Sequence, residues 1–173
     1  MTKGLYHFIR QAWKKPDVKT LRARMVEWRK GNAIEKLEKP LRLDRARALG
    51  YKAKKGFVVC RVRVIRGGHK RTRPKKGRKI QNLTIRKNLS VNYRGICEQR
   101  AQKKFKNLEV LNSYQVGKDG KHYFYEVILV DPCRNEIKND KTMNWISSKK
   151  NKNRVYRGLT SAEKKSRGLR GKN

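Results

Sequence analysis

The chain has 173 residues, and 49 Lys and Arg side chains against 13 Asp and Glu side chains give it a formal net charge of +36. Self-repulsion at this density destabilises a compact state, so we expect a polyanion, most simply a nucleic acid, to neutralise it. No apolar run is long enough to span a bilayer, and the N-terminus lacks the apolar core of a signal peptide, which excludes a membrane protein and favours a soluble, intracellular one.

The length and a hydrophobic content of 36% favour one modest core with extensions over two domains. We expect a core over residues 1–146, with a helical N-terminal part and a basic loop at 66–87, followed by an extended basic tail at 147–173. The tail carries ten Lys or Arg residues against Glu163 alone, so we expect it to bury too little surface to order itself. It would be either a solubilising tail or an extension threaded between nucleic-acid strands.

The cysteines and histidines show no spacing typical of a metal site. Cys60, Cys97 and Cys133 lie far apart, so we expect reduced, buried thiols. No second histidine or cysteine stands two to five residues from any histidine, which predicts no metal and no cofactor. Acids are scattered singly, and Gly67-Gly68 lacks the later glycines of a phosphate-binding loop, so we predict no enzyme activity and no small-molecule substrate.

Apolar residues recur at helical spacing over residues 4–14, which predicts an amphipathic helix ended by Pro16. Asp17 is expected to cap a second helix that runs to Lys30, with Gly31 as its stop. The side of this second helix that we expect to be buried consists of Val18, Leu21, Met25 and Trp28.

A connector around Pro40 is expected to lead to a short helix that Asp44 caps and Gly50 closes. Tyr51 follows among cations. It suits stacking on a base or ribose as well as it suits a solvent-facing linker.

A β-strand is predicted over residues 58–66, where successive side chains point to opposite faces. One face is an apolar row, while Arg61 and Arg63 share the other face, which we interpret as facing something anionic. Gly67-Gly68 breaks the strand, and the basic loop follows with no acid before Glu98. Residues 80–87 are expected to form a second short strand.

A helix is predicted over residues 88–104, capped by Ser90 or Asn92 and weakened in its middle by Gly95. Segments 108–116 and 122–130 flank an Asp-Gly turn, which predicts a hairpin whose apolar second arm is central in the sheet. The aromatic residues of the hairpin are assigned to the core rather than to a base-stacking platform, with any outward-facing member as an exception; they are Tyr114, Tyr123, Phe124 and Tyr125.

The cations are spread over helices, strand, loop and tail, which indicates contact on many sides, as inside a folded RNA. A reader of duplex DNA would concentrate them on one recognition element. The predicted RNA-binding residues are Arg42, Arg45, Arg47, Tyr51, Lys52, Lys54, Lys55, Arg61, Arg63, Arg66, His69, Lys70, Arg71, Arg73, Lys75, Lys76, Arg78, Lys79, Lys149, Lys150, Arg154, Arg157, Lys164, Lys165, Arg167 and Arg170.

Short motifs that occur together in one family's order run from Leu5 to Leu169 of this chain. They include Leu43-Asp44-Arg45-Ala46-Arg47, Gly50-Tyr51-Lys52-Ala53-Lys54, Arg66-Gly67-Gly68, residues 107–114, 126–132 and 144–146, Arg157-Gly158-Leu159-Thr160-Ser161-Ala162 and Arg167-Gly168-Leu169. On these motifs the chain resembles the large-subunit ribosomal protein fifteen family of the archaeal and eukaryotic type.

The resemblance implies an α+β fold, with a small antiparallel sheet, packed helices, and long basic loop and C-terminal extensions embedded in RNA. It also implies a non-catalytic structural constituent of the large ribosomal subunit in the cytoplasm, which binds and stabilises folded large-subunit ribosomal RNA beside neighbouring ribosomal proteins. A free-standing, sequence-tolerant nucleic-acid-binding or RNA-chaperone protein is the alternative, for which charge alone would suffice. A basic nuclease is a third class, whose catalytic residues the sequence does not reveal.

Overall fold

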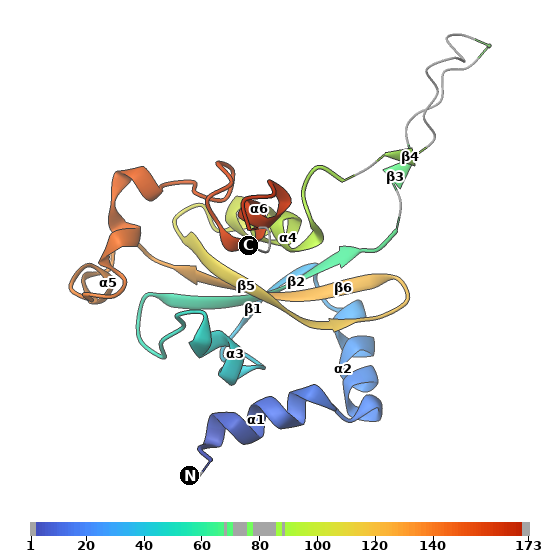
Figure 1. The fold of residues 1–173 in the computed structure, drawn as a ribbon, viewed down its shortest axis with the longest axis horizontal. Helices are drawn as coiled ribbons and strands as arrows, with labels where there is room; N and C mark the ends of the chain where they lie inside the picture. The colour runs from blue at the N-terminus through green and yellow to red at the C-terminus, as the bar shows by residue number, and fades with distance from the viewer. Residues whose placement is uncertain (1–2, 68, 71–75, 78–85, 88, 171–173) are drawn as a thin grey trace.

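The structure is a computed structural model that describes residues 3–67, 69–70, 76–77, 86–87 and 89–170. Its centre is a four-stranded antiparallel sheet in the order β1-β2-β6-β5, with helices on both sides (Figure 1). The strands are β1 (Ile34–Leu37), β2 (Phe57–Ile65), β5 (Glu109–Lys118) and β6 (His122–Val130). The α-helices of the described residues are α1 (Leu5–Lys14), α2 (Val18–Lys30), α3 (Leu43–Ala48), α4 (Tyr93–Lys104), α5 (Asn135–Lys138) and α6 (Ser161–Ser166). The predicted α+β fold with a small antiparallel sheet is confirmed.

Strand β6 lies inside the sheet, because it pairs with β2 on one side and with β5 on the other. Its residues are buried on both faces of the sheet. Its side chains alternate between two apolar clusters: Phe124 and Ile128 enter one, while Val127 and Leu129 enter the other. Burying a side chain of this size stabilises a protein by about 1.5–3 kcal/mol. The prediction that the second hairpin arm is central is confirmed.

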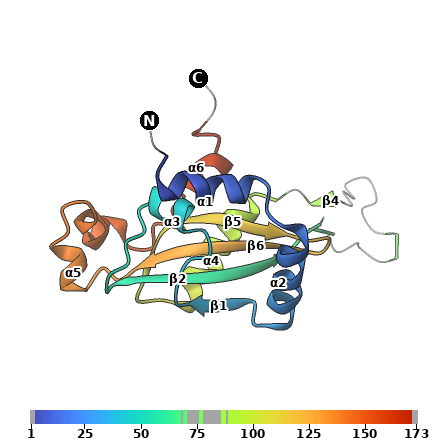
Figure 2. The same ribbon diagram turned by 90° about the horizontal axis from the view of Figure 1, so that it is seen from below.

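Different helices cover the two faces of the sheet. Met25 and Trp28 of α2 and Ala46 of α3 belong to the first apolar cluster, whereas Cys97 and Ala101 of α4 belong to the second. Figure 1 accordingly shows α4 and α6 on the side of the sheet opposite to α2 and α3. In Figure 2, the strand order places β5 at the edge nearest to α1 and α6. Elements from both ends of the chain therefore meet along the β5 edge.

The N-terminal helices form as predicted, and their burial differs in part. Asp17 caps α2, because its carboxylate accepts hydrogen bonds from two first-turn backbone amides at 3.2 and 3.0 Å. Met25 and Trp28 are buried as expected. The predicted burial of Val18 is wrong, because it lies at the start of α2, away from the sheet that the later turns contact.

Helix α1 has the predicted amphipathic pattern, yet it contains no buried residue and Phe8 is exposed. Two of its aromatic side chains instead make cation–π contacts with arginines of the α3 region. The Arg42 guanidinium lies 5.0 Å from the Trp13 ring centroid, and that of Arg47 lies 5.4 Å from the Tyr6 centroid. Two predicted RNA-binding arginines thus lie against α1.

Strand β1 was not predicted, since the sequence analysis assigned the segment before Pro40 to a connector. Ile34–Leu37 pair antiparallel with β2, with Glu35 opposite Arg61. Four residues with two adjacent charges are too few to show an alternating pattern. The strand forms because its backbone can pair with the edge of β2.

Helix α3 forms where a short helix was predicted, but its cap differs. Arg42 occupies the N-cap position, so Asp44 lies inside the first turn and is buried. Gly50 closes the segment as expected, with a positive φ of 99° that favours glycine.

Most of the predicted basic loop at 66–87, and most of the predicted strand at 80–87, lies outside the described residues. Inside that range, β3 (His69–Lys70) pairs antiparallel with β4 (Arg86–Lys87), and residues 76–77 form a turn.

The predicted hairpin between β5 and β6 is confirmed, with Asp119 accepting a hydrogen bond from the Lys121 backbone amide at 2.7 Å in the turn. Helix α4 is also confirmed, although it begins at Tyr93. Its predicted cap Asn92 accepts a hydrogen bond from the Gly95 amide at 2.7 Å.

The expectation that the C-terminal segment would not order itself is wrong for residues 147–170. The 3-10 helices η2 (Asn144–Ser147) and η3 (Lys149–Asn151) lead to α6, and Val155 is buried in the second apolar cluster beside α4. A Cβ on Gly95 would lie 2.6 Å from the Glu163 Oε1 atom, so this glycine lets α6 approach α4 closely. The few apolar residues of this segment are irregularly spaced, which hid their burial from the sequence pattern.

Two of the three thiols match the prediction. Cys60 and Cys97 are free and buried, and burial raises the pKa of Cys60 to about 12, so it stays protonated at neutral pH. The predicted burial of Cys133 is wrong, because it follows Pro132 in an exposed loop beyond the sheet.

Replacing Val155 by Ala tests the docking of the C-terminal segment. The loss of two buried methyl groups and the cavity left behind should lower the free energy of unfolding by about 2 kcal/mol. Lys152→Ala, which removes an exposed side chain nearby, should change this free energy by less than about 0.5 kcal/mol. Urea unfolding of both variants measures the difference, and equal values would contradict the burial of Val155.

Candidate nucleic-acid interface

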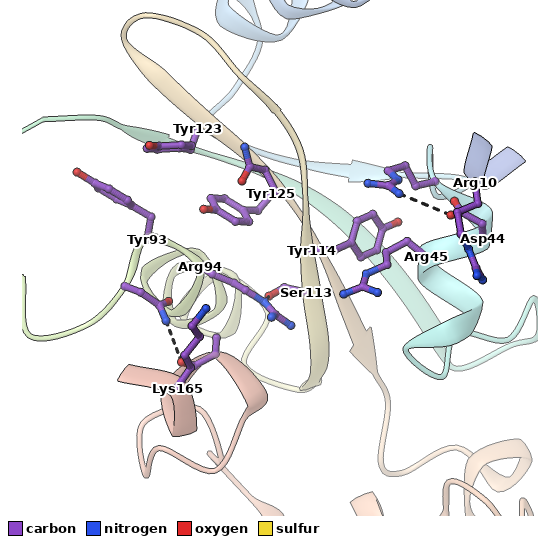
Figure 3. Close-up of a pocket in the computed structure, with 14 residues that line it drawn as sticks. Arg10, Asp44, Arg45, Tyr93, Arg94, Ser113, Tyr114, Tyr123, Tyr125 and Lys165 are labelled. Atoms are coloured by element: carbon purple, nitrogen blue, oxygen red, sulfur yellow. Dashed lines mark hydrogen bonds and ion pairs between the residues drawn. The ribbon is translucent and has the colours of Figure 1, made fainter. Parts of the chain in front are cut away.

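A cleft of about 660 Å³ lies along the β5 edge of the sheet. Its lining comes from α1, the α3 region, α4, the β5–β6 hairpin and α6, which are far apart in sequence. Figure 3 shows Asp44 and Arg45 on one side of the hairpin, and Tyr93, Arg94 and Lys165 on the other. The charged residues of the lining are Arg10, Arg42, Asp44, Arg45, Arg94 and Lys165. Five cations thus share the cleft with one carboxylate.

Three tyrosines form one wall of the cleft. The ring centroids of Tyr93 and Tyr123 lie 4.9 Å apart, and those of Tyr123 and Tyr125 lie 6.2 Å apart. The Tyr93 hydroxyl donates to the Gly67 carbonyl oxygen at 3.0 Å, and the Arg66 guanidinium lies 4.9 Å from the Tyr123 centroid. The exit of strand β2 is thereby tied to the aromatic wall.

Arg94 is held in place by buried polar groups. Its Nε donates to the Ser113 hydroxyl at 2.8 Å and lies 3.8 Å from a carboxylate oxygen of Glu98. Ser113 in turn donates to Glu98, whose side chain is fully buried. Burial raises the pKa of Glu98, while the Ser113 hydrogen bond and the Arg94 charge oppose this rise. The result is a positioned guanidinium on the cleft wall.

Three other cations of the cleft are open to solvent. Arg10, Arg45 and Lys165 are exposed, and none has an ion-pair or side-chain hydrogen-bond partner among the described residues. Asp44 does not neutralise them, because its carboxylate is engaged at 3.6 Å by Arg42. The cleft therefore keeps an excess of positive charge.

Some predicted RNA-binding residues have partners inside the protein. Lys52 and Lys54 both donate to Asp140, with Lys52 Nζ 2.7 Å from Asp140 Oδ2, and these hydrogen bonds hold the pKa of Asp140 well below its usual range. Tyr51 packs edge-to-face on Phe57 at 5.8 Å, beside the first apolar cluster. The structure thus gives each of these residues a structural contact, and their contact with RNA stays a prediction.

Arg61 and Arg63 share one face of β2, as the alternation predicted. That face is not open: Arg61 pairs with Glu35 and lies 4.7 Å from the Trp28 ring centroid. Arg63 donates to the Trp28 carbonyl oxygen at 3.1 Å and to that of Arg29, at the negative end of the α2 dipole. Helix α2 lies over this face, and Glu35 on the neighbouring strand β1 pairs with Arg61, so both arginines have partners inside the protein. RNA contact by either arginine stays a prediction.

Two predicted cations of the C-terminal segment hold that segment in place. Arg154 donates to the carbonyl oxygens of Val110 and Leu111 at 2.8 and 3.0 Å, and Arg157 donates to that of Lys152 at 2.9 Å. Arginines in such positions satisfy backbone carbonyls that helices and strands leave open.

The remaining predicted residues are either exposed, half-buried or outside the described residues. Those that are exposed and lack an ion-pair partner within the described ranges include Arg45, Arg47, Lys55, Lys76, Lys149, Lys150, Lys165, Arg167 and Arg170. Lys164 is half-buried on α6. Outside the described residues lie Arg71, Arg73, Lys75, Arg78 and Lys79, and only the backbone of His69 and Lys70 is described.

The cleft residues that the sequence did not predict include Arg10, Tyr93, Arg94 and Tyr123. The assignment of hairpin aromatics to the core is confirmed for Tyr114, Phe124 and Tyr125, while Tyr123 is half-buried against the second apolar cluster and is the exception that the assignment allowed. The available signal was the position of Tyr93-Arg94 directly after a helix cap, but nothing local shows that α4 faces the hairpin tip.

Over the described ranges, no group of three or more His, Cys, Asp or Glu side chains could hold a metal ion. None of the described helices is long and apolar enough to cross a membrane.

The fold and its surface define a small, strongly basic α+β protein with a cationic, tyrosine-lined cleft. Within this class, a family model described as Ribosomal L15 matches residues 4–173, and the chain belongs to that family. The resemblance seen in the sequence motifs is confirmed, and the protein is a structural ribosomal protein of the large subunit.

Asp140→Asn tests whether Lys52 and Lys54 serve the fold. The depressed pKa of Asp140 means that its carboxylate stabilises the folded state above its unfolded pKa, and that this contribution is lost as pH falls through the folded pKa. The variant should therefore melt at a lower temperature than the unmodified chain at pH 7, and the gap should narrow below about pH 4.

Glu136→Gln is the matched control, since Glu136 is an exposed acid of the neighbouring helix α5. Thermal unfolding over a pH series gives the readout. If both substitutions shift the melting temperature equally at pH 7, the lysines do not depend on Asp140.

Proposed function

We propose that this protein binds and stabilises folded large-subunit ribosomal RNA in cytoplasmic ribosomes, with the β5-edge cleft as a principal contact and without catalysis. Membership of the Ribosomal L15 family supports the ribosomal setting. The observation that carries the proposal is the excess of cations in the cleft, where Arg10, Arg45 and Lys165 have no carboxylate partner among the described residues.

The cleft combines two kinds of group that suit RNA. Arg and Lys neutralise phosphates and release counterions, which gives affinity with a steep salt dependence. Tyrosine rings and guanidinium planes stack with unpaired bases, which are the parts of RNA that proteins read most readily. Because Arg94 is already positioned by Ser113, it can donate to a phosphate or base without losing further side-chain freedom.

The rival function is a free-standing, sequence-tolerant nucleic-acid-binding or RNA-chaperone protein. It requires charge alone, and it gives no reason for a family match across residues 4–173. Sucrose-gradient sedimentation of a cell lysate separates the two. The protein should stay in the large-subunit peak at moderate salt, and its absence from that peak would favour the rival.

A triple variant, Arg10→Gln, Arg45→Gln and Lys165→Gln, tests the cleft. Losing three phosphate contacts should reduce the slope of log affinity against log salt concentration by about 2–3 for large-subunit RNA. Thermal stability should hardly change, since exposed substitutions of this kind cost less than about 0.5 kcal/mol each. Filter binding over a salt series and thermal unfolding supply the two readouts.

The matched control removes the same charge from the N-terminal helices through Lys14→Gln, Lys15→Gln and Lys19→Gln, all exposed and outside the cleft. It should retain more of the salt slope than the cleft variant. Equal slopes for the two variants would mean that net charge, and not the cleft, governs binding.

A further inference from the structure

A second basic surface lies at the end of the sheet away from the hairpin turn. Four exposed lysines surround a hollow of about 590 Å³: Lys106 before β5, Lys138 in α5, Lys149 in η3, and Lys152. We call these four residues the lysine face. Two adjoining hollows, of about 530 and 390 Å³, share Lys106, so the surface continues past the first hollow.

The acids beside the lysine face are occupied by the protein itself. Glu109 is buried and accepts a hydrogen bond from the Asn153 backbone amide at 2.9 Å. Asp131 accepts from the Cys133 amide at 3.0 Å and lies 3.5 Å from the Arg134 guanidinium. Among the described residues, none of the four lysines has an ion-pair partner. Four lysines thus share the hollow with two carboxylates that have partners elsewhere in the fold, which leaves an excess of positive charge and favours an anionic ligand.

The lysine face is separate from the cleft. Glu109 lines the first hollow and Gln115 lines the cleft, both on strand β5. Six strand residues at about 3.3 Å each place them about 20 Å apart. One phosphate group cannot reach both surfaces, so two segments of nucleic acid, or two distant parts of one, would be needed to fill them.

The two surfaces also differ in chemistry. The cleft has arginines and tyrosines, which suit unstacked bases. The lysine face has compact ammonium groups, and no aromatic side chain lines its hollow of about 590 Å³. Lysine ammonium groups neutralise phosphates as point charges and read no base. This composition fits the regular phosphate backbone of an RNA duplex.

We propose that the lysine face binds the phosphate backbone of a double-stranded RNA segment while the cleft holds an unpaired segment, so that the protein bridges the two. The inference rests on the proposed function and adds the structure of the RNA that each surface recognises. It makes the protein a connector between a helix and a neighbouring single strand.

The test uses the full chain with two probes: a uridine oligonucleotide of about 12 nucleotides and an RNA duplex of about 16 base pairs. The lysine-face variant carries Lys106→Gln, Lys138→Gln, Lys149→Gln and Lys152→Gln. Its control carries Lys14→Gln, Lys15→Gln, Lys19→Gln and Lys30→Gln, which remove the same charge from exposed positions elsewhere.

Relative to the control, the lysine-face variant should bind the duplex at least about tenfold more weakly, with a salt slope reduced by about 3–4. Its affinity for the single strand should equal that of the control. In a capture experiment with the single strand immobilised, the unmodified chain should retain a labelled duplex and the lysine-face variant should not.

Duplex affinity equal to that of the control, or an equal loss of both probes, would overturn the proposal. A circular-dichroism melt of each variant shows whether a loss arises from unfolding. If the lysine-face variant folds, enters large subunits and binds both probes like its control, only the bridging inference fails. Exclusion of the unmodified chain from large subunits would instead contradict the proposed function.

Discussion

The scarcity of acidic side chains is the constraint on which this structure depends. All 13 lie within the described residues, and all but Glu27, Glu38 and Glu136 accept a side-chain hydrogen bond or ion pair inside the protein. Several are buried, including Glu98 and Glu126. Because the carboxylates bind the fold's own cations, backbone amides and hydroxyls, few remain to neutralise the surface. The carboxylates that stabilise the fold are therefore not available to neutralise surface lysines and arginines, and the surface stays cationic.

The architecture of the sheet leaves two separate basic surfaces open to a ligand, the cleft and the lysine face. Strand β6 is covered on both faces, so neither face of the sheet centre is available for a ligand. The open positions are the β5 edge and the end of the hairpin away from its turn, where helices from distant parts of the chain converge (Figure 2). Ordered packing of residues 147–170 completes both surfaces, since Lys165 lines one and Lys149 and Lys152 line the other.

Local signals in the sequence predicted the elements that local chemistry decides. Asp17 caps its helix and the Asp119-Gly120 turn closes its hairpin, because each depends on residues within a few positions. Strand β1 and the docking of Val155 depend on partners far along the chain, and no short-range pattern records them. The site shows the same limit: Lys52 and Arg45 are both cations in one basic run, yet only the fold brings Asp140 to the first and leaves the second open.

A density map of the large ribosomal subunit that contains this protein tests the central claim most directly. We expect RNA phosphate or base atoms within about 2.7–3.2 Å of the Arg45 and Lys165 side-chain nitrogens. We also expect Arg61 to remain on Glu35, as in the isolated chain. A cleft filled by protein or solvent, with no RNA near Arg45 or Lys165, would contradict the cleft as an RNA contact.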